Sequence, residues 1–138
     1  MAEEMQEPIG SSTYIAIVAP VWLQNALLVF LHSTPALKLV ACTATVQVLL
    51  ALDLDKIPEL IIIETEKDYR RAQDQIERIK AAWPASHVIA LIPDKSLRVF
   101  VQAAGATEVL VSGTSPEQLR QAIAQLTHSD KDALTGPL

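Results

Sequence analysis

Short runs of aliphatic residues alternate along the chain with longer stretches in which apolar residues recur every three or four positions. Runs of four to six aliphatic and β-branched residues are typical of strands, and the longer period is typical of helices that bury one face. The runs predict five strands, over residues 14–18, 37–41, 60–63, 88–92 and 108–111. No internal repeat is visible.

The stretches between and after these runs predict five helices. Pro84 and Gly105 stand where the third and fourth helices should stop, and Ser115, Pro116 and Gln118 form a capping box with proline at the first helical position. The apolar stripes are Leu23, Leu27, Phe30 and Leu31; Val46, Leu49 and Leu50; Ala72, Ile76, Ile79 and Trp83; Leu97, Phe100, Val101 and Ala104; and Leu119, Ala122, Ile123 and Leu126.

Strands that alternate with helices predict an α/β fold with a doubly wound parallel sheet, because right-handed crossovers place helices on both faces. The run at 60–63 has no polar alternation, as expected of a central strand that is covered on both sides. We expect a flavodoxin-like (βα)5 fold with five strands in the order 2-1-3-4-5. Functional residues of such folds lie at the carboxyl ends of the strands.

Composition favours one mildly acidic globular domain. The 138 residues are 50% hydrophobic, and 11 Lys and Arg stand against 16 Asp and Glu, for a formal net charge of -5. This composition excludes intrinsic disorder for the body of the chain. We expect residues 13–126 to form the domain, residues 1–12 to be an N-terminal tail, and residues 127–138 to be a C-terminal tail or linker stub.

Several classes of partner are disfavoured. No apolar run approaches the length that spans a bilayer, and the N-terminus is acidic rather than basic, so we expect no membrane segment and a cytoplasmic location. The single cysteine, Cys42, excludes an internal disulfide or a cysteine zinc site. A pI near 5.1 argues against direct nucleic-acid binding by this domain.

The strand ends carry little chemistry. The chain offers Ala19 and Pro20 after the first strand, Glu64 after the third, Ile92 and Pro93 at the end of the fourth, and Ser112 after the fifth. One carboxylate without a second carboxylate, histidine or cysteine beside it is a poor catalytic or metal site. We therefore expect no enzyme activity, no metal and no cofactor.

Several segments resemble response-regulator receiver domains of the NarL/LuxR type, which are CheY-like. The similarity covers about residues 13–126, and its segments fall in family order and at family spacing. They are IAIVAPVWLQNALL at 15–28, PELIIIE at 58–64, WPASHVIAL at 83–91, AAGA at 103–106, VLV at 109–111 and SPEQL at 115–119. The resemblance implies the receiver fold and a role in two-component phosphorelay signalling.

The departures from the receiver pattern fall on its phosphorylation residues. Ala19 and Pro20 replace the acidic pair that binds Mg²⁺, and Glu64 replaces the phosphorylated Asp. The remaining replacements are Ile92 for the Thr or Ser, Ser112 for the Lys and Val109 for the switch aromatic. Phosphoryl transfer needs the metal and the Lys to neutralise charge. The sequence therefore predicts a pseudo-receiver that neither accepts phosphate nor switches in the usual way.

Two interpretations of Glu64 remain open. Its permanent charge either mimics a phosphoryl group or simply faces water at a strand end. Lys95, in the loop after the fourth strand, is the cation that would compensate the charge, although a lone Lys at a helix start is usually solvated. The main alternative function is a flavodoxin-like small-ligand binder, because the residues at the strand ends would form a largely neutral crevice.

The predicted fourth helix is apolar on more than one face, through Leu97, Val99, Phe100 and Val101. This excess predicts a homodimer or a docking surface for a signalling protein, with tight internal packing as the alternative. A second candidate surface is the first helix together with the fifth, where Trp22 and Val29 lie off the main stripe. The segment 132–136 resembles the entry into diguanylate cyclase domains, and 137–138 would equally lead into a DNA-binding output domain.

Overall fold

The computed structural model describes residues 13–135, with side chains as far as Leu126. One parallel sheet contains, in the order β2-β1-β3-β4-β5, the strands β1 (Thr13–Val18), β2 (Leu37–Thr43), β3 (Leu60–Glu64), β4 (His87–Ile92) and β5 (Glu108–Val111). The helices are α2 (Val21–His32), α3 (Val46–Ala51), α4 (Tyr69–Ala82), the short 3-10 helix η1 (Lys95–Leu97), α5 (Arg98–Ala104) and α6 (Pro116–Thr135). The expected five-stranded fold and strand order are confirmed.

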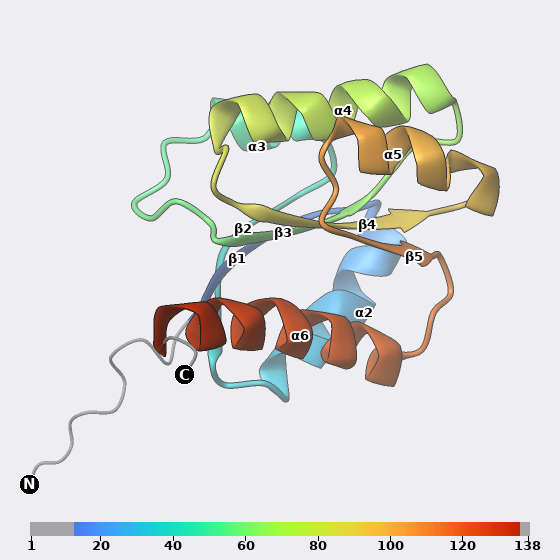
Figure 1. Ribbon diagram of the computed structural model, residues 1–138. Coiled ribbons are helices and arrows are strands. Elements are labelled where there is room, and N and C mark those ends of the chain that lie inside the picture. Colours follow the sequence, from blue (N-terminus) through green and yellow to red (C-terminus); the bar gives the residue numbers. More distant parts are fainter. Residues whose placement is uncertain (1–12, 136–138) are drawn as a thin grey trace, which may run out of the picture.

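The helices cover both faces of the sheet (Figure 1). We call the face under α3, α4 and α5 the α4–α5 face, and the opposite one, under α2 and α6, the α2–α6 face. Side chains alternate between the two faces along each strand. Ile61 and Ile63 of β3 join the core of the α4–α5 face, while Leu60 and Ile62 join that of the α2–α6 face. All four are buried, which is why the run has no polar alternation.

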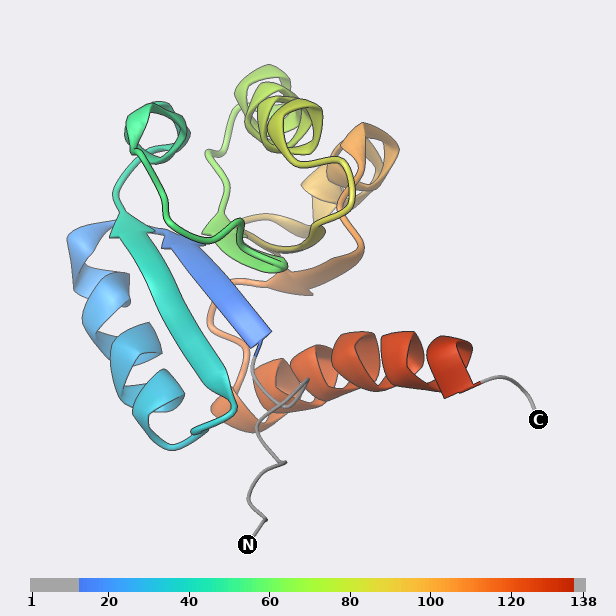
Figure 2. The ribbon, with the colours of Figure 1, turned by 90° about the vertical axis from the view of Figure 1, so that its left-hand side faces the viewer.

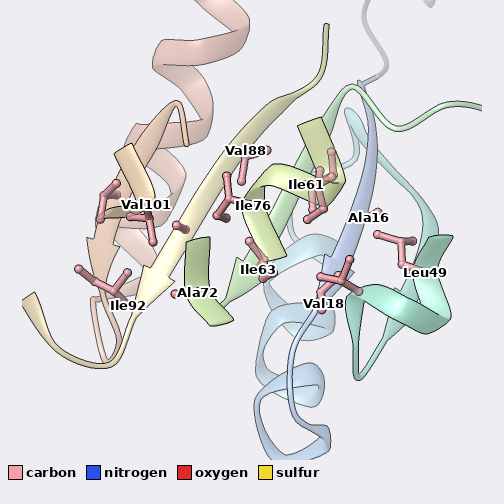
Figure 3. Packing of buried hydrophobic residues seen from close by; sticks show 14 of the residues in the cluster. Ala16, Val18, Leu49, Ile61, Ile63, Ala72, Ile76, Val88, Ile92 and Val101 are labelled. Carbon is pink, nitrogen blue, oxygen red and sulfur yellow. The ribbon is translucent and has the colours of Figure 1, made fainter. Parts of the chain in front are cut away.

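The core of the α4–α5 face is made of aliphatic side chains from the strands and the helices above them (Figure 3). Leu49 of α3, Ile76 of α4 and Val101 of α5 are completely buried there. These residues belong to the apolar stripes that the sequence predicts. Packing on both faces fixes the sheet rigidly, so the residues at the carboxyl ends of the strands have defined neighbours.

Gly105 ends α5, as the sequence predicts. Its φ of +122° is a backbone conformation that residues other than glycine rarely adopt. A Cβ added at this position would also lie 2.9 Å from Lys80 Cγ. Lys80 in turn donates from Nζ to the carbonyls of Pro84 and Ser86, at 2.9 and 2.7 Å. The turn after α4 and the turn after α5 are thus packed against each other.

The capping box at the start of α6 is confirmed. The Gln118 backbone N–H donates to Ser115 Oγ at 3.2 Å, and the Ser115 N–H donates to Gln118 Oε1 at 3.4 Å. The helix α6 continues to Thr135, nine residues beyond the domain boundary expected at residue 126. The segment after Leu126 is polar but contains no helix breaker before Gly136. Figure 2 shows the end of α6 running past the sheet.

Among residues 13–135, no helix combines the length and the apolar character that a membrane crossing requires.

Candidate functional site

The sheet reverses its direction of growth between β1 and β3. The chain passes from β1 outward to β2, and then returns to place β3 on the other side of β1. In open α/β sheets such a switch point leaves a crevice beyond the carboxyl ends of the strands. Pro20 follows β1 at this position and Glu64 ends β3, so the crevice lies at the residues that the sequence singles out.

Glu64 and Ser112 are brought together. Ser112 Oγ donates a hydrogen bond to Glu64 Oε2 at 3.2 Å, although 48 residues separate them in the chain. The other oxygen, Oε1, is buried and has no hydrogen-bond partner among the described residues. The neighbouring Thr65 also has a buried hydroxyl without a partner in that part of the chain. The carboxylate is thus held by one neutral donor.

The end of β1 offers no carboxylate. Ala19 is only 1% exposed, and its carbonyl accepts a hydrogen bond from Gln24 Nε2 at 2.8 Å. Pro20 precedes the first residue of α2 and lines the same cavity as Glu64. The two positions where the sequence resemblance predicts the loss of the Mg²⁺-binding pair thus carry an alanine methyl group and a proline ring.

Ile92 and Val109 do not join Glu64. Both are buried in the core of the α4–α5 face, because alternate residues of a strand point to opposite sides. The β4 residue opposite Glu64 in the register is Leu91, which packs on the α2–α6 face. Leu91 is the neighbour that sequence reasoning missed, since the register between two strands is not visible in either strand alone.

A cavity of about 610 Å³ lies between α3 and α4 at the ends of β1 and β3. We call it the α3–α4 cavity. Its charged walls come from α4 and the loop before it, where Arg71 lies 3.3 Å from Glu66 and Arg78 lies 3.9 Å from Asp74. The sequence gives a signal for this wall, because residues 71, 74 and 78 share one helix face.

A second cavity, of about 200 Å³, lies between α2 and the start of α6. We call it the α2–α6 cavity. Its walls are mostly apolar, with Leu27 and Phe30 from α2 and Leu119 from α6. Glu64, Leu91 and Ser112 reach it from the strand ends. Glu64 therefore stands between the two cavities and contributes to both.

The donor set at this edge does not fit a receiver-type Mg²⁺ ion. Such an ion is bound by several oxygen ligands, mainly carboxylates. Glu64 is the carboxylate at the strand ends, and Glu66 is engaged by Arg71. No group of three His, Cys, Asp or Glu side chains that could hold a metal is found in the described part of the chain.

Other candidate residues lie away from Glu64. Lys95 is exposed at the start of η1, and nothing described links it to the Glu64 carboxylate. His32 is exposed at the end of α2 and His87 is partly buried in β4, while the side chain of His128 lies outside the described residues. Cys42 is partly buried, and this burial raises the pKa of its thiol.

The surface expected on the fourth helix is reduced by the fold. Leu97 is 3% exposed and Val101 is fully buried, because both point to the sheet, so neither can contribute to a surface. Phe100 is half-buried and stacks on Tyr69, with ring centroids 4.5 Å apart. Val99 alone of the four is highly exposed, at 70%. On α2, in contrast, Trp22 and Val29 are 69% and 71% exposed, as expected for residues off the main stripe.

Comparison with known proteins gives matches among solved structures. The isolated receiver domain of RcsB from Salmonella enterica serovar Typhimurium, with the phosphomimetic BeF3-, superimposes with a TM-score of 0.74 at 16% identity over 85% of this chain and 89% of that one. The BeF3-activated DrrB receiver domain gives 0.69 at 16% identity, over 83% and 96%. No family model matches the sequence, and no curated protein matches it.

A longer RcsB structure, described as two dimers bound to two parallel DNAs, gives a TM-score of 0.72 at 16% identity. The match covers 86% of this chain and 61% of that chain. These similarities concern the backbone, because so few residues are identical. The strand order, the helices on both faces and these superpositions agree: the chain has the fold of response-regulator receiver domains.

Proposed function

We propose that the protein is a pseudo-receiver: a phosphorylation-independent, non-enzymatic receiver-like domain of bacterial signal transduction that acts in the cytoplasm by binding another protein or a second copy of itself. The fold is that of two-component receivers, which are regulatory rather than catalytic. We infer that this domain acts without the phosphorylation residues of the receiver pattern.

The observation that carries the proposal is the environment of Glu64. Its carboxylate receives a hydrogen bond from a neutral hydroxyl, Ser112, at the position where the receiver pattern places a Lys. Pro20 stands where the pattern places a Mg²⁺ ligand. A phosphoryl group that approached Glu64 would find neither the Lys nor the Mg²⁺ ligand of the receiver pattern beside the carboxylate, and phosphoryl transfer needs the positive charge that they supply. The site thus lacks both groups that make aspartyl phosphorylation favourable.

Exposed apolar side chains support a role in protein binding. Val21, Trp22 and Val29 on α2 are each exposed by 66% or more, and large exposed apolar residues that lie together are typical of interaction surfaces. The structural neighbour RcsB forms dimers in its DNA complex. We propose that α2, rather than α5, provides most of the contact surface here.

The test is phosphorylation by acetyl phosphate in the presence of Mg²⁺, followed by intact-mass measurement. We expect no phosphorylated species, because neither a metal ligand set nor a Lys is available at Glu64. A conventional receiver treated in parallel must be labelled for the result to count. Labelling of most wild-type molecules, lost in Glu64→Gln, would overturn the proposal.

A further inference from the structure

We propose that the α2–α6 cavity binds a small organic cation, an amine or guanidine attached to one aromatic or branched aliphatic group. The ammonium would lie at Glu64 and the apolar group between α2 and α6. This inference goes beyond the proposed function and does not depend on it. It rests on the shape, the lining and the charge of one cavity.

The lining separates into an apolar part and a polar end. Leu27 and Phe30 of α2 face Leu119 of α6 across the cavity, and Leu91 closes it from the sheet. These residues belong to the core of the α2–α6 face, so the inner wall of the cavity is formed by that core. Ligand sites commonly combine such apolar walls with one or two polar groups that fix orientation.

Charge decides which ligand fits. Glu64 is the charged residue among those that line the α2–α6 cavity, and no ion pair to it is found among the described residues. Arg120, just beyond the lining residues, lies over the Phe30 ring and is paired with Glu117 at 2.6 Å. A carboxylate at the polar end of an apolar cavity favours a cation, because the low surrounding polarity strengthens their attraction.

The carboxylate and the neighbouring hydroxyl form the polar end together. Oε2 accepts the hydrogen bond of Ser112, whereas Oε1 is buried without a hydrogen-bond partner among the described residues, and both residues line the cavity. An ammonium at this end would donate to the carboxylate while Ser112 Oγ provides a second acceptor. Charge-assisted hydrogen bonds of this kind are about twice as strong as neutral ones.

Size limits the ligand to one ring. The cavity volume is about 200 Å³. An apolar protein cavity of roughly 150 Å³ holds benzene, so this one accommodates a single ring with a short amine-bearing chain. 2-Phenylethylamine has this size and charge, and it is the probe for the test. Its neutral and anionic counterparts are 2-phenylethanol and phenylacetate.

The experiment is isothermal titration calorimetry of the full chain with the three probes at neutral pH and low salt. We expect 2-phenylethylamine to bind with a Kd of about 1 mM or lower, as suits so small a ligand. The alcohol should bind about tenfold more weakly, and the acid should show no saturable heat. Equal binding of all three probes, or no binding of the amine, would overturn the proposal.

Two matched pairs of variants locate the site. Glu64→Gln should weaken amine binding about tenfold, while Glu66→Gln, which alters a carboxylate of the α3–α4 cavity, should leave it unchanged. Ala26→Phe, at an exposed α2 position that lines the α2–α6 cavity, should abolish binding by filling it, and Ala81→Phe on α4 should not. A loss caused by Glu66→Gln and not by Glu64→Gln would assign the cation to the wrong cavity and refute the inference.

The two proposals fail independently. Phosphorylation of Glu64 with unchanged amine binding would contradict the pseudo-receiver proposal alone. Absence of amine binding in a protein that resists acetyl phosphate would contradict the cavity proposal alone. Both measurements use the same purified wild-type chain.

Discussion

Ser86 is a buried residue whose hydroxyl contributes to the stability of the fold. It is 4% exposed, and its Oγ donates to the carbonyl of Pro58 at 2.6 Å, which joins the segments that lead into β4 and β3. Ser86→Ala leaves that carbonyl without this donor, and we expect the free energy of unfolding to fall by about 1–3 kcal/mol. Urea denaturation measures the change. Ser96→Ala, at an exposed position, is the control and should change stability by less than about 0.5 kcal/mol. Equal effects of the two substitutions would contradict this account.

The start of α6 matters as a unit, because this helix forms one wall of the α2–α6 cavity. Ser115 Oγ accepts from the Gln118 N–H, one of the donors that a helix cannot satisfy internally. We expect Ser115→Ala to lower the free energy of unfolding by about 1 kcal/mol, and Ser115→Asn, which keeps an acceptor, to lower it by only a few tenths. Thermal unfolding followed by circular dichroism distinguishes the two. If Asn were as harmful as Ala, the cap would not be the cause.

Across the molecule, exposed large apolar side chains occur on several elements, and α2 carries three of them against one, Val99, on α5. We expect a concentration-dependent dimer at micromolar concentrations in sedimentation equilibrium. Val29→Asp should raise its dissociation constant at least about tenfold, since a charge would be buried at the contact. Val99→Asp should have little effect. The reverse order would place the contact on α5, and a monomer at all concentrations would contradict self-association.

Much of this architecture was predictable from local patterns. The aliphatic run at 60–63 marks the central strand because it must be apolar on both sides, and Ser115 to Gln118 marks a helix start because the residues that bond to each other are three apart. The alternation of strands and helices also predicted the strand order that the structure has. Glu64 was found because it is a lone carboxylate at the end of an apolar run.

The details of the site depend on contacts between distant segments, which such patterns do not contain. Sequence reasoning placed Ile92 near Glu64, yet the register puts Leu91 there and turns Ile92 to the opposite face. It also counted Leu97 and Val101 as surface residues, because a short helix with apolar residues on several sides does not reveal which side meets the sheet.

The sequence alone thus determined the order of strands and helices and the cap of α6, since each is a property of neighbouring residues. From side-chain types it also predicted that the receiver's charged residues are replaced, and this remains a prediction. The Ser112–Glu64 hydrogen bond, the partner of Glu64 in β4 and the α2–α6 cavity arise only on folding. They depend on strand register and on the packing of two helices against one sheet, and both are set by the sum of many contacts across the whole chain.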